Sequence, residues 1–225
     1  MGVSVNSDLR TAKVSAHLKV LYGVVGLLVF VGLPLLFYAL GDFPRRSLLK
    51  EVISLATLLA FSLMLGQLFL ARSNMDVIAL YSLKRVKRLH TVIAYSAVTV
   101  LLLHPLLIVL PRSFEAGVGP LDALATLLTT FDNLGVVLGL VAWILLFILV
   151  PTSFLRVRII QALRTKYPKW RSFHGGLSVA LIAAAIVHAI ELGRHTTPPL
   201  ATFYVVVAAA GVGLLFRMYF TSERK

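Results

Sequence analysis

The sequence predicts an all-α membrane protein built as a bundle of six transmembrane helices. The chain has 225 residues, of which 59% are hydrophobic and only 14% are charged. Its mean hydropathy of +0.91 is far above that of a soluble domain. Apolar runs of about 20 residues, the length that crosses a bilayer as a helix, recur along the chain. Short polar connections separate them, so we expect one membrane domain without a soluble lobe.

These runs define a membrane domain at 18–219, between tails at 1–17 and 220–225. The first run is too long for a signal peptide, and no small-residue cleavage site follows it. Between the third and fourth runs, leucines at helical spacing predict an amphipathic helix at the membrane interface or packed on the bundle. Glycines in the runs, such as Gly135 and Gly139, are expected to be helix-packing contacts. The six runs are residues 18–40, 51–71, 89–110, 133–154, 173–192 and 200–219.

The distribution of Lys and Arg orients the bundle. Of 22 such residues, seventeen lie in the N-terminal segment, the second and fourth connections and the C-terminal tail. Because cytoplasmic loops collect Lys and Arg, we expect both termini in the cytoplasm, with the third and fifth runs crossing in the same direction. The same bias accounts for the net charge of +13, so no nucleic-acid partner is inferred. The chain has no cysteine, which excludes thiolate metal sites and a cysteine nucleophile.

Four of the six histidines lie inside apolar runs, His90 and His104 in the third and His174 and His188 in the fifth. Each pair is fourteen positions apart, four turns at the 3.5-residue period of packed helices, so both rings face the same neighbour. At about 1.5 Å per residue, the two rings are roughly 21 Å apart along the helix. His90 and His174 then share the cytoplasmic level, and His104 and His188 share the outer level.

Several chemistries could use such histidines. Each ring could satisfy a hydrogen bond inside the bundle, but duplicated spacing makes that a poor account of four. A zinc or iron cage needs about four ligands around one ion, whereas each level offers two nitrogens. A proton relay uses closer steps and carboxylates. Two facing imidazoles suit the axial positions of a low-spin haem b, so we expect two stacked haems with the four histidines as iron ligands.

Basic residues near the two levels are candidate contacts for haem propionates. Arg88 and Arg171 are the candidates at the inner level, although topology bias also explains their charge. Arg112 and Arg194 are the candidates at the outer level. Arg194 and His195 together form a candidate site for an electron acceptor. A solvated loop is an equally good account of these outer residues.

Two stretches resemble a known family: YSLKRVKRLHTVIAYSAVTVLLLHPLLIVL at 81–110 and KWRSFHGGLSVALIAAAIVHAIEL at 169–192. Both are similar to the ferric reductase-like transmembrane domain, which NADPH oxidases, yeast-type ferric reductases and STEAP metalloreductases share. The resemblance implies six helices with four axial histidines on the third and fifth. Those roles would carry over to His90, His104, His174 and His188.

Many members of that family continue into a flavin- and NADPH-binding module, but no Rossmann-type glycine fingerprint follows the sixth run here. We therefore expect electrons from a separate cytoplasmic flavoprotein using NAD(P)H, or from quinol. The outer acceptor would be a ferric chelate, oxygen or a redox protein. The chain is thus interpreted as the haem-bearing part of a transmembrane oxidoreductase, a multi-pass integral membrane protein of the cytoplasmic or plasma membrane if its source is prokaryotic.

Two alternatives stay open. One is a quinone-linked cytochrome b anchor for a partner enzyme, similar to the haem-binding membrane subunit of the periplasmic methionine sulfoxide reductase system. The other is a non-redox transporter whose histidines bind a metal or a proton.

Overall fold

The computed structural model describes residues 16–44, 46–115 and 117–222, and the regular structure within them is helical. Six of the described helices are long and apolar enough to cross a membrane, which confirms the six-helix, multi-pass membrane fold. The first, Ala16–Leu40, includes the π-helical turn η1 (Leu28–Gly32) and ends in α2 (Leu33–Leu40). The others are α3 (Leu48–Gly66), α5 (Leu83–Glu115), α7 (Leu134–Phe154), α9 (Tyr167–Leu192) and α10 (Pro198–Ser222).

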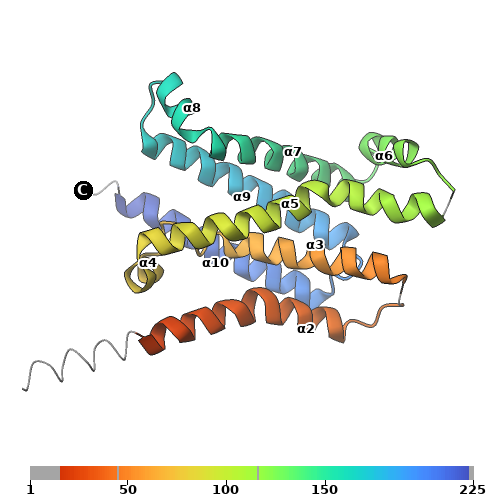
Figure 1. The fold of residues 1–225 in the computed structure, drawn as a ribbon, viewed down its shortest axis with the longest axis horizontal. Coiled ribbons are helices and arrows are strands. Elements are labelled where there is room, and N and C mark those ends of the chain that lie inside the picture. Colours follow the sequence, from red (N-terminus) through yellow and green to blue (C-terminus); the bar gives the residue numbers. More distant parts are fainter. Residues whose placement is uncertain (1–15, 45, 116, 223–225) are drawn as a thin grey trace, which may run out of the picture.

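Three short helices lie in the connections: α4 (Met75–Tyr81), α6 (Pro120–Thr129) and α8 (Arg156–Ala162). Helices α4 and α8 lie at the same end of the bundle as the described C-terminus, and α6 lies at the opposite end (Figure 1). Helix α6 is the amphipathic helix that the leucine spacing predicts, and it packs against α5.

The helices that carry the membrane histidines belong to two hairpins of the same construction. Helix α3 packs against α5, which follows it, and α7 packs against α9, which follows it. In each hairpin the second helix carries two of the four membrane histidines, and we call the first one the support helix. Helix α10 packs against both α9 and α3, and the first span packs against α3. The two hairpins are therefore held together on one side by the remaining spans.

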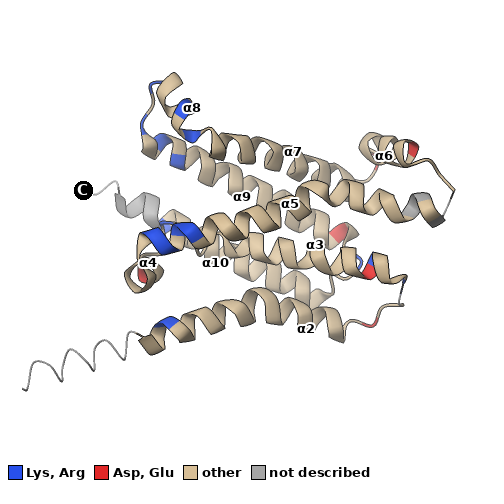
Figure 2. Ribbon diagram, viewed as in Figure 1, with Lys and Arg blue, Asp and Glu red and all other residues tan. Residues whose placement is uncertain are grey.

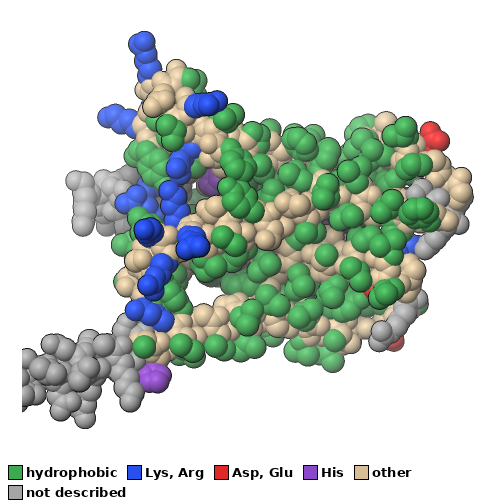
Figure 3. Space-filling view, viewed as in Figure 1, with side chains coloured by type: hydrophobic (Ala, Val, Ile, Leu, Met, Phe, Trp, Pro, Cys, Tyr) green, Lys and Arg blue, Asp and Glu red, His purple; other side chains and the backbone are tan. Residues whose placement is uncertain are grey.

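A buried apolar core joins these helices. Leu65 of α3 and Leu200 of α10 are fully buried, and Phe61 meets Tyr204 edge-on with ring centroids 4.9 Å apart. Large apolar side chains are also exposed over the middle of the bundle (Figure 3). Hydrocarbon tails can cover such a surface, whereas water would make it costly.

The charges divide along the long axis of the bundle. Lys and Arg gather at the end that carries α4, α8 and the first turns of α5 and α9 (Figure 2). We call this the basic end. It carries Lys84, Arg85, Lys87, Arg88, Arg156, Arg158, Arg164, Lys166, Lys169 and Arg171.

The second span differs from its predicted bounds of 51–71. Helix α3 starts at Leu48, ahead of Glu51, and ends at Gly66. Beyond it the chain turns more tightly, because the backbone N–H groups of Leu68 and Phe69 bond carbonyls three residues back. These residues are apolar, so hydropathy alone could not separate them from the helix.

Candidate functional site

The structure brings the four membrane histidines together as two pairs. His104 of α5 and His188 of α9 lie with ring centroids 6.3 Å apart and ring planes at 83°. His90 and His174 lie nearer the basic end and are close enough to interact electrostatically. We call these the far pair and the near pair. Each pair takes one ring from each hairpin, as the helix direction and spacing predict.

The far pair has both Nδ1 atoms engaged by the support helices. The Nδ1 of His188 lies 2.8 Å from the carbonyl oxygen of Gly135 on α7. A carbonyl can only accept, so this Nδ1 carries the proton. The Nδ1 of His104 lies 3.3 Å from the hydroxyl of Thr57 on α3. That hydroxyl donates to the carbonyl of Ile53 at 2.8 Å, so its oxygen accepts from His104. Both rings therefore keep the Nε2 lone pair for another partner.

In the near pair, the ring of His174 is bound in the same way. The Nδ1 of His174 lies 3.2 Å from the hydroxyl of Ser153 on α7. Ser153 donates its own proton to the carbonyl of Leu149 at 2.7 Å, so it too is set to accept from a ring N–H. By contrast, the Nδ1 of His90 is buried and has no hydrogen-bond partner among the described residues.

An aromatic stack connects the near pair with the basic end. The ring of Trp170 lies over His174, with centroids 5.1 Å apart at 23°, and Tyr167 stacks on Trp170 at 5.9 Å. The guanidinium of Arg156 from α8 sits 5.5 Å from the Trp170 ring. Trp170 is almost wholly buried, whereas Tyr167 is exposed. The stack therefore runs from the surface of the basic end to a ring of the near pair.

The residues predicted to contact haem propionates or an electron acceptor differ in their exposure. Arg88 is exposed and Arg171 is half-buried. The side chain of Arg112 lies outside the described residues. Arg194 is exposed and donates to the carbonyl of Pro44 at 2.9 Å, while the adjacent His195 is buried.

His195 belongs to a polar cluster that the sequence analysis missed. Glu51 accepts from the hydroxyl of Tyr38 and from Arg46, whose Nε lies 3.1 Å from Oε1. The Nη2 of Arg46 also lies 2.6 Å from the hydroxyl of Ser54 and 3.4 Å from Nε2 of His195. The sequence does contain a pattern that indicates this cluster. Glu51, Ser54 and Thr57 follow one another at intervals of three residues, which places three polar side chains on one face of an apolar span.

The surroundings of His195 shift its pKa. Burial lowers the pKa of His195 below its ordinary value, and the guanidinium groups of Arg46 and Arg194 add to this, whereas Glu51 opposes it. The ring packs between Tyr38 and Phe43, each with its centroid 4.8 Å away.

We expect this histidine to make the protein less stable in acid. Because the unfolded chain binds the His195 proton more readily than the folded one, its contribution is lost as pH falls below the unfolded pKa of about 6.5. Thermal unfolding in detergent at about pH 8 and about pH 5.5 measures this loss. His195→Gln, which cannot titrate, should show a smaller drop between the two conditions. An equal drop in both proteins would mean that other groups dominate.

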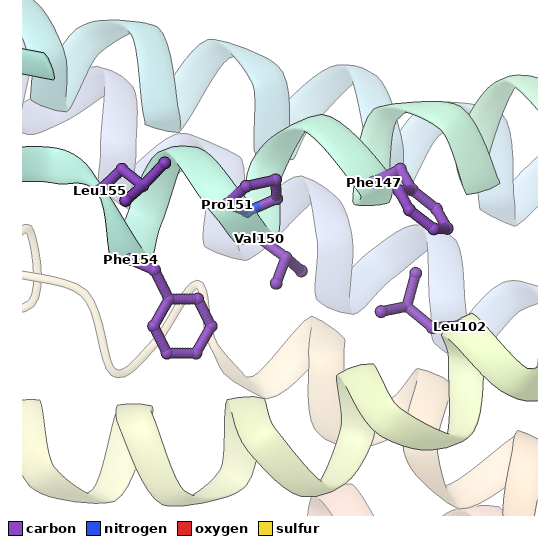
Figure 4. A pocket seen from close by; sticks show the side chains of 6 residues that line it. All are labelled: Leu102, Phe147, Val150, Pro151, Phe154 and Leu155. Carbon is purple, nitrogen blue, oxygen red and sulfur yellow. The ribbon is translucent and has the colours of Figure 1, made fainter.

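Two further features limit what the site can bind. Among the described residues, no three or more His, Asp or Glu side chains come together as a metal-ion cage. An apolar groove of about 340 Å³ lies between α5 and α7, lined by Leu102, Phe147, Val150, Pro151, Phe154 and Leu155 (Figure 4). Its lining suits hydrocarbon and supplies no reactive group.

The helices and histidine pairs agree with a comparison against known families. Residues 56–185, more than half of the chain, match the family model of the ferric reductase like transmembrane component. The chain belongs to this family. The match includes His90, His104 and His174, and His188 lies three residues beyond its end.

The chain is also similar to an archaeal protein. An uncharacterized protein of Archaeoglobus fulgidus is 37% identical over 169 residues, which are 75% of this chain and 90% of that protein. No solved structure matches the chain. The family supports a membrane redox role and the interpretation of the chain as an oxidoreductase component.

Proposed function

We propose that this protein is the haem-bearing component of a transmembrane reductase, with one haem b at each histidine pair. His104 and His188 would hold the outer haem, and His90 and His174 the inner one. The observation that carries the proposal is the far pair: two imidazoles from different hairpins lie with ring centroids 6.3 Å apart, and each has its Nδ1 bound elsewhere.

The spacing of the far pair fits an iron between the rings. An iron held by both imidazoles would need the two rings close to each other but not in direct contact. The observed separation is 6.3 Å. A tetrahedral zinc site would need further ligands close by, and the described residues offer no such group of three.

Two buried polar atoms support a second site at the near pair. The Nδ1 of His90 and the Oε1 of Gln67 lack hydrogen-bond partners among the described residues. Gln67 lies beside His90, because its backbone is close enough to interact with the imidazole ring. Buried polar atoms are costly when left unpaired, so this end of the ligand helices suits a bound group that the protein chain does not supply.

Bound haem would supply reversible one-electron transfer at the two levels. If His104 and His188 both held the iron, they would leave no position on it for an acceptor, which would then have to approach the edge of the outer site. Positive-inside bias puts the basic end in the cytoplasm. An inside-negative potential then favours outward electron movement by about 2.3 kcal/mol per 100 mV. This direction suits reduction of a ferric chelate, oxygen or a redox protein at the outer face.

The electron donor is proposed to be a separate flavoprotein that uses NAD(P)H. The basic end carries ten Lys and Arg residues on or beside α5, α8 and α9, and the Tyr167–Trp170 stack leads from this end to His174. A donor docked there would be close to the inner site.

The optical spectrum of the purified protein tests the proposal directly. We expect the sharp bands of low-spin haem b after dithionite, and a pyridine haemochrome assay should give two haems per chain. A colourless protein would overturn the proposal and favour a non-redox transporter.

A quinone-linked anchor is the second candidate function. The apolar groove between α5 and α7 favours it, because a hydrocarbon tail could lie there beside a ligand helix (Figure 4). Haem reduction by quinol in membranes without NAD(P)H and flavoprotein would select this candidate.

A further inference from the structure

Two glycines on α7 form a recess for the ring of His188. A Cβ atom at Gly139 would lie 2.6 Å from Cε1 and 3.1 Å from Cγ of that ring, and it would come closest to Nδ1. Real Cβ atoms essentially never come as close as the first of these distances, and the second is tighter than most Cβ contacts. Gly135, one turn earlier, supplies the carbonyl that binds the Nδ1 of His188. Gly139 thus leaves space for the imidazole, and Gly135 fixes its direction.

The recess differs from ordinary close packing of helices. Small residues four apart commonly let two backbones approach, and Gly135 does meet α9, since its Cβ would lie 2.7 Å from Cγ of Leu192. At Gly66 and Gly211 the added atom would meet the side chains of Phe30 and Leu68. At Gly139, by contrast, the nearest atoms to the added Cβ all belong to a histidine ring.

Thr57 of α3 fixes the direction of the His104 ring, as Gly135 of α7 does for His188. Because its hydroxyl proton goes to Ile53, the oxygen can accept only from the ring N–H. Such a bond fixes the tautomer and orientation of a metal-binding imidazole and increases its basicity. Both rings of the far pair therefore have an Nδ1 partner, whereas in the near pair His174 has one and the Nδ1 of His90 meets no hydrogen-bond partner in the part of the chain that the structure describes.

We propose that Gly135, Gly139 and Thr57 are positioning residues of the outer haem site, and that this site binds haem more tightly than the inner one. The inference rests on the proposed function, because it assigns roles around haem ligands. The two sites should therefore lose haem in a fixed order. On dilution, or in competition with a haem acceptor, the inner haem leaves first.

The main test is Gly139→Ala, with Gly213→Ala as the matched control. At Gly213 of α10 an added Cβ would meet nothing within 4 Å. Alanine favours a helix over glycine by up to about 1 kcal/mol, so neither change should weaken its helix. We expect Gly139→Ala to lose the outer haem and keep the inner one, and Gly213→Ala to keep both. Haem per chain and the low-spin ferric EPR signals measure this.

A second variant tests the hydrogen bond without added bulk. Thr57→Val keeps the shape of the side chain and removes the acceptor, while Thr57→Ser restores it. Losing such a partner typically costs about 10–100-fold in metal affinity. We expect Thr57→Val to release its outer haem to apomyoglobin at least about tenfold faster, to raise the midpoint potential of that haem, and Thr57→Ser to recover both properties.

The outcomes separate the two proposals. A wild-type chain without haem overturns the proposed function, and this inference with it. A wild-type chain with two haems, combined with a Gly139→Ala variant that keeps both and has unchanged EPR signals, overturns only the positioning roles. Faster loss of the outer haem than of the inner one from the wild type contradicts the proposed order.

Discussion

Replacing His104 or His188 by alanine should remove one of two haems and leave the other spectroscopically intact. Each residue offers half of the far pair, whose ring centroids lie 6.3 Å apart. Without one ring, a single imidazole from one hairpin remains, and low-spin bis-histidine ligation is lost. Haem content should fall from two to one per chain, with loss of the same EPR signal in both variants. His90→Ala and His174→Ala should remove the other haem and the other signal.

A suitable control is His17→Ala, because His17 is exposed at the start of the first span, away from both pairs. It should retain two haems. If His90→Ala and His188→Ala removed the same signal, the pairing by level would be wrong. Equal loss of both haems from each single variant would show that the two sites form only together.

Reversing four charges at the basic end should slow haem reduction by a flavoprotein without changing haem content. The residues are Lys84, Arg85, Arg164 and Lys166, which are all exposed. Charged surfaces steer oppositely charged partners and raise association rates by about 10–1,000-fold at low ionic strength. Changing all four to Glu should therefore slow reduction by about tenfold or more. Membrane vesicles with NAD(P)H and candidate flavoproteins supply the assay.

The matched control exchanges Lys for Arg and Arg for Lys at the same positions, which preserves the charge. It should reduce at the wild-type rate. Added salt should also slow the wild type, because charges farther apart than about 8–10 Å are screened near physiological ionic strength. A rate that ignores both salt and the four reversals would point to electron delivery from a lipid-soluble quinol.

The fold could be predicted because hydropathy and helix period are properties of consecutive residues. Six apolar runs gave six spans, and the fourteen-residue spacing placed His90 level with His174 and His104 level with His188. The bounds of α3 could not be predicted as well from the sequence. Glu51 and Lys50 lower the hydropathy where this helix begins, yet the Glu51 carboxylate is accommodated by Tyr38 and Arg46 from other segments.

The partners of the histidines were not predictable for a related reason. Thr57 and Ser153 each donate to a carbonyl four residues back in their own helix. A hydroxyl in an apolar span can form its hydrogen bond within its own helix. Its presence in the sequence therefore does not indicate that it also contacts a histidine. Whether it also meets a histidine depends on how two helices are rotated against each other. The same holds for Gly139, whose role depends on which side chain faces it.

The order of the hairpins along the chain has a consequence for how the protein is made. Thr57 precedes His104, Gly135 precedes His188, and Ser153 precedes His174, in each case on the span just before. Chains generally fold from the N-terminus during synthesis. His104, His174 and His188 therefore enter a membrane that already contains the groups that bind their Nδ1 atoms. The first hairpin can be complete before the second is translated, and each proposed haem site stays half-built until α9 arrives. Under this proposal haem capture follows the insertion of α9, and it joins the two hairpins.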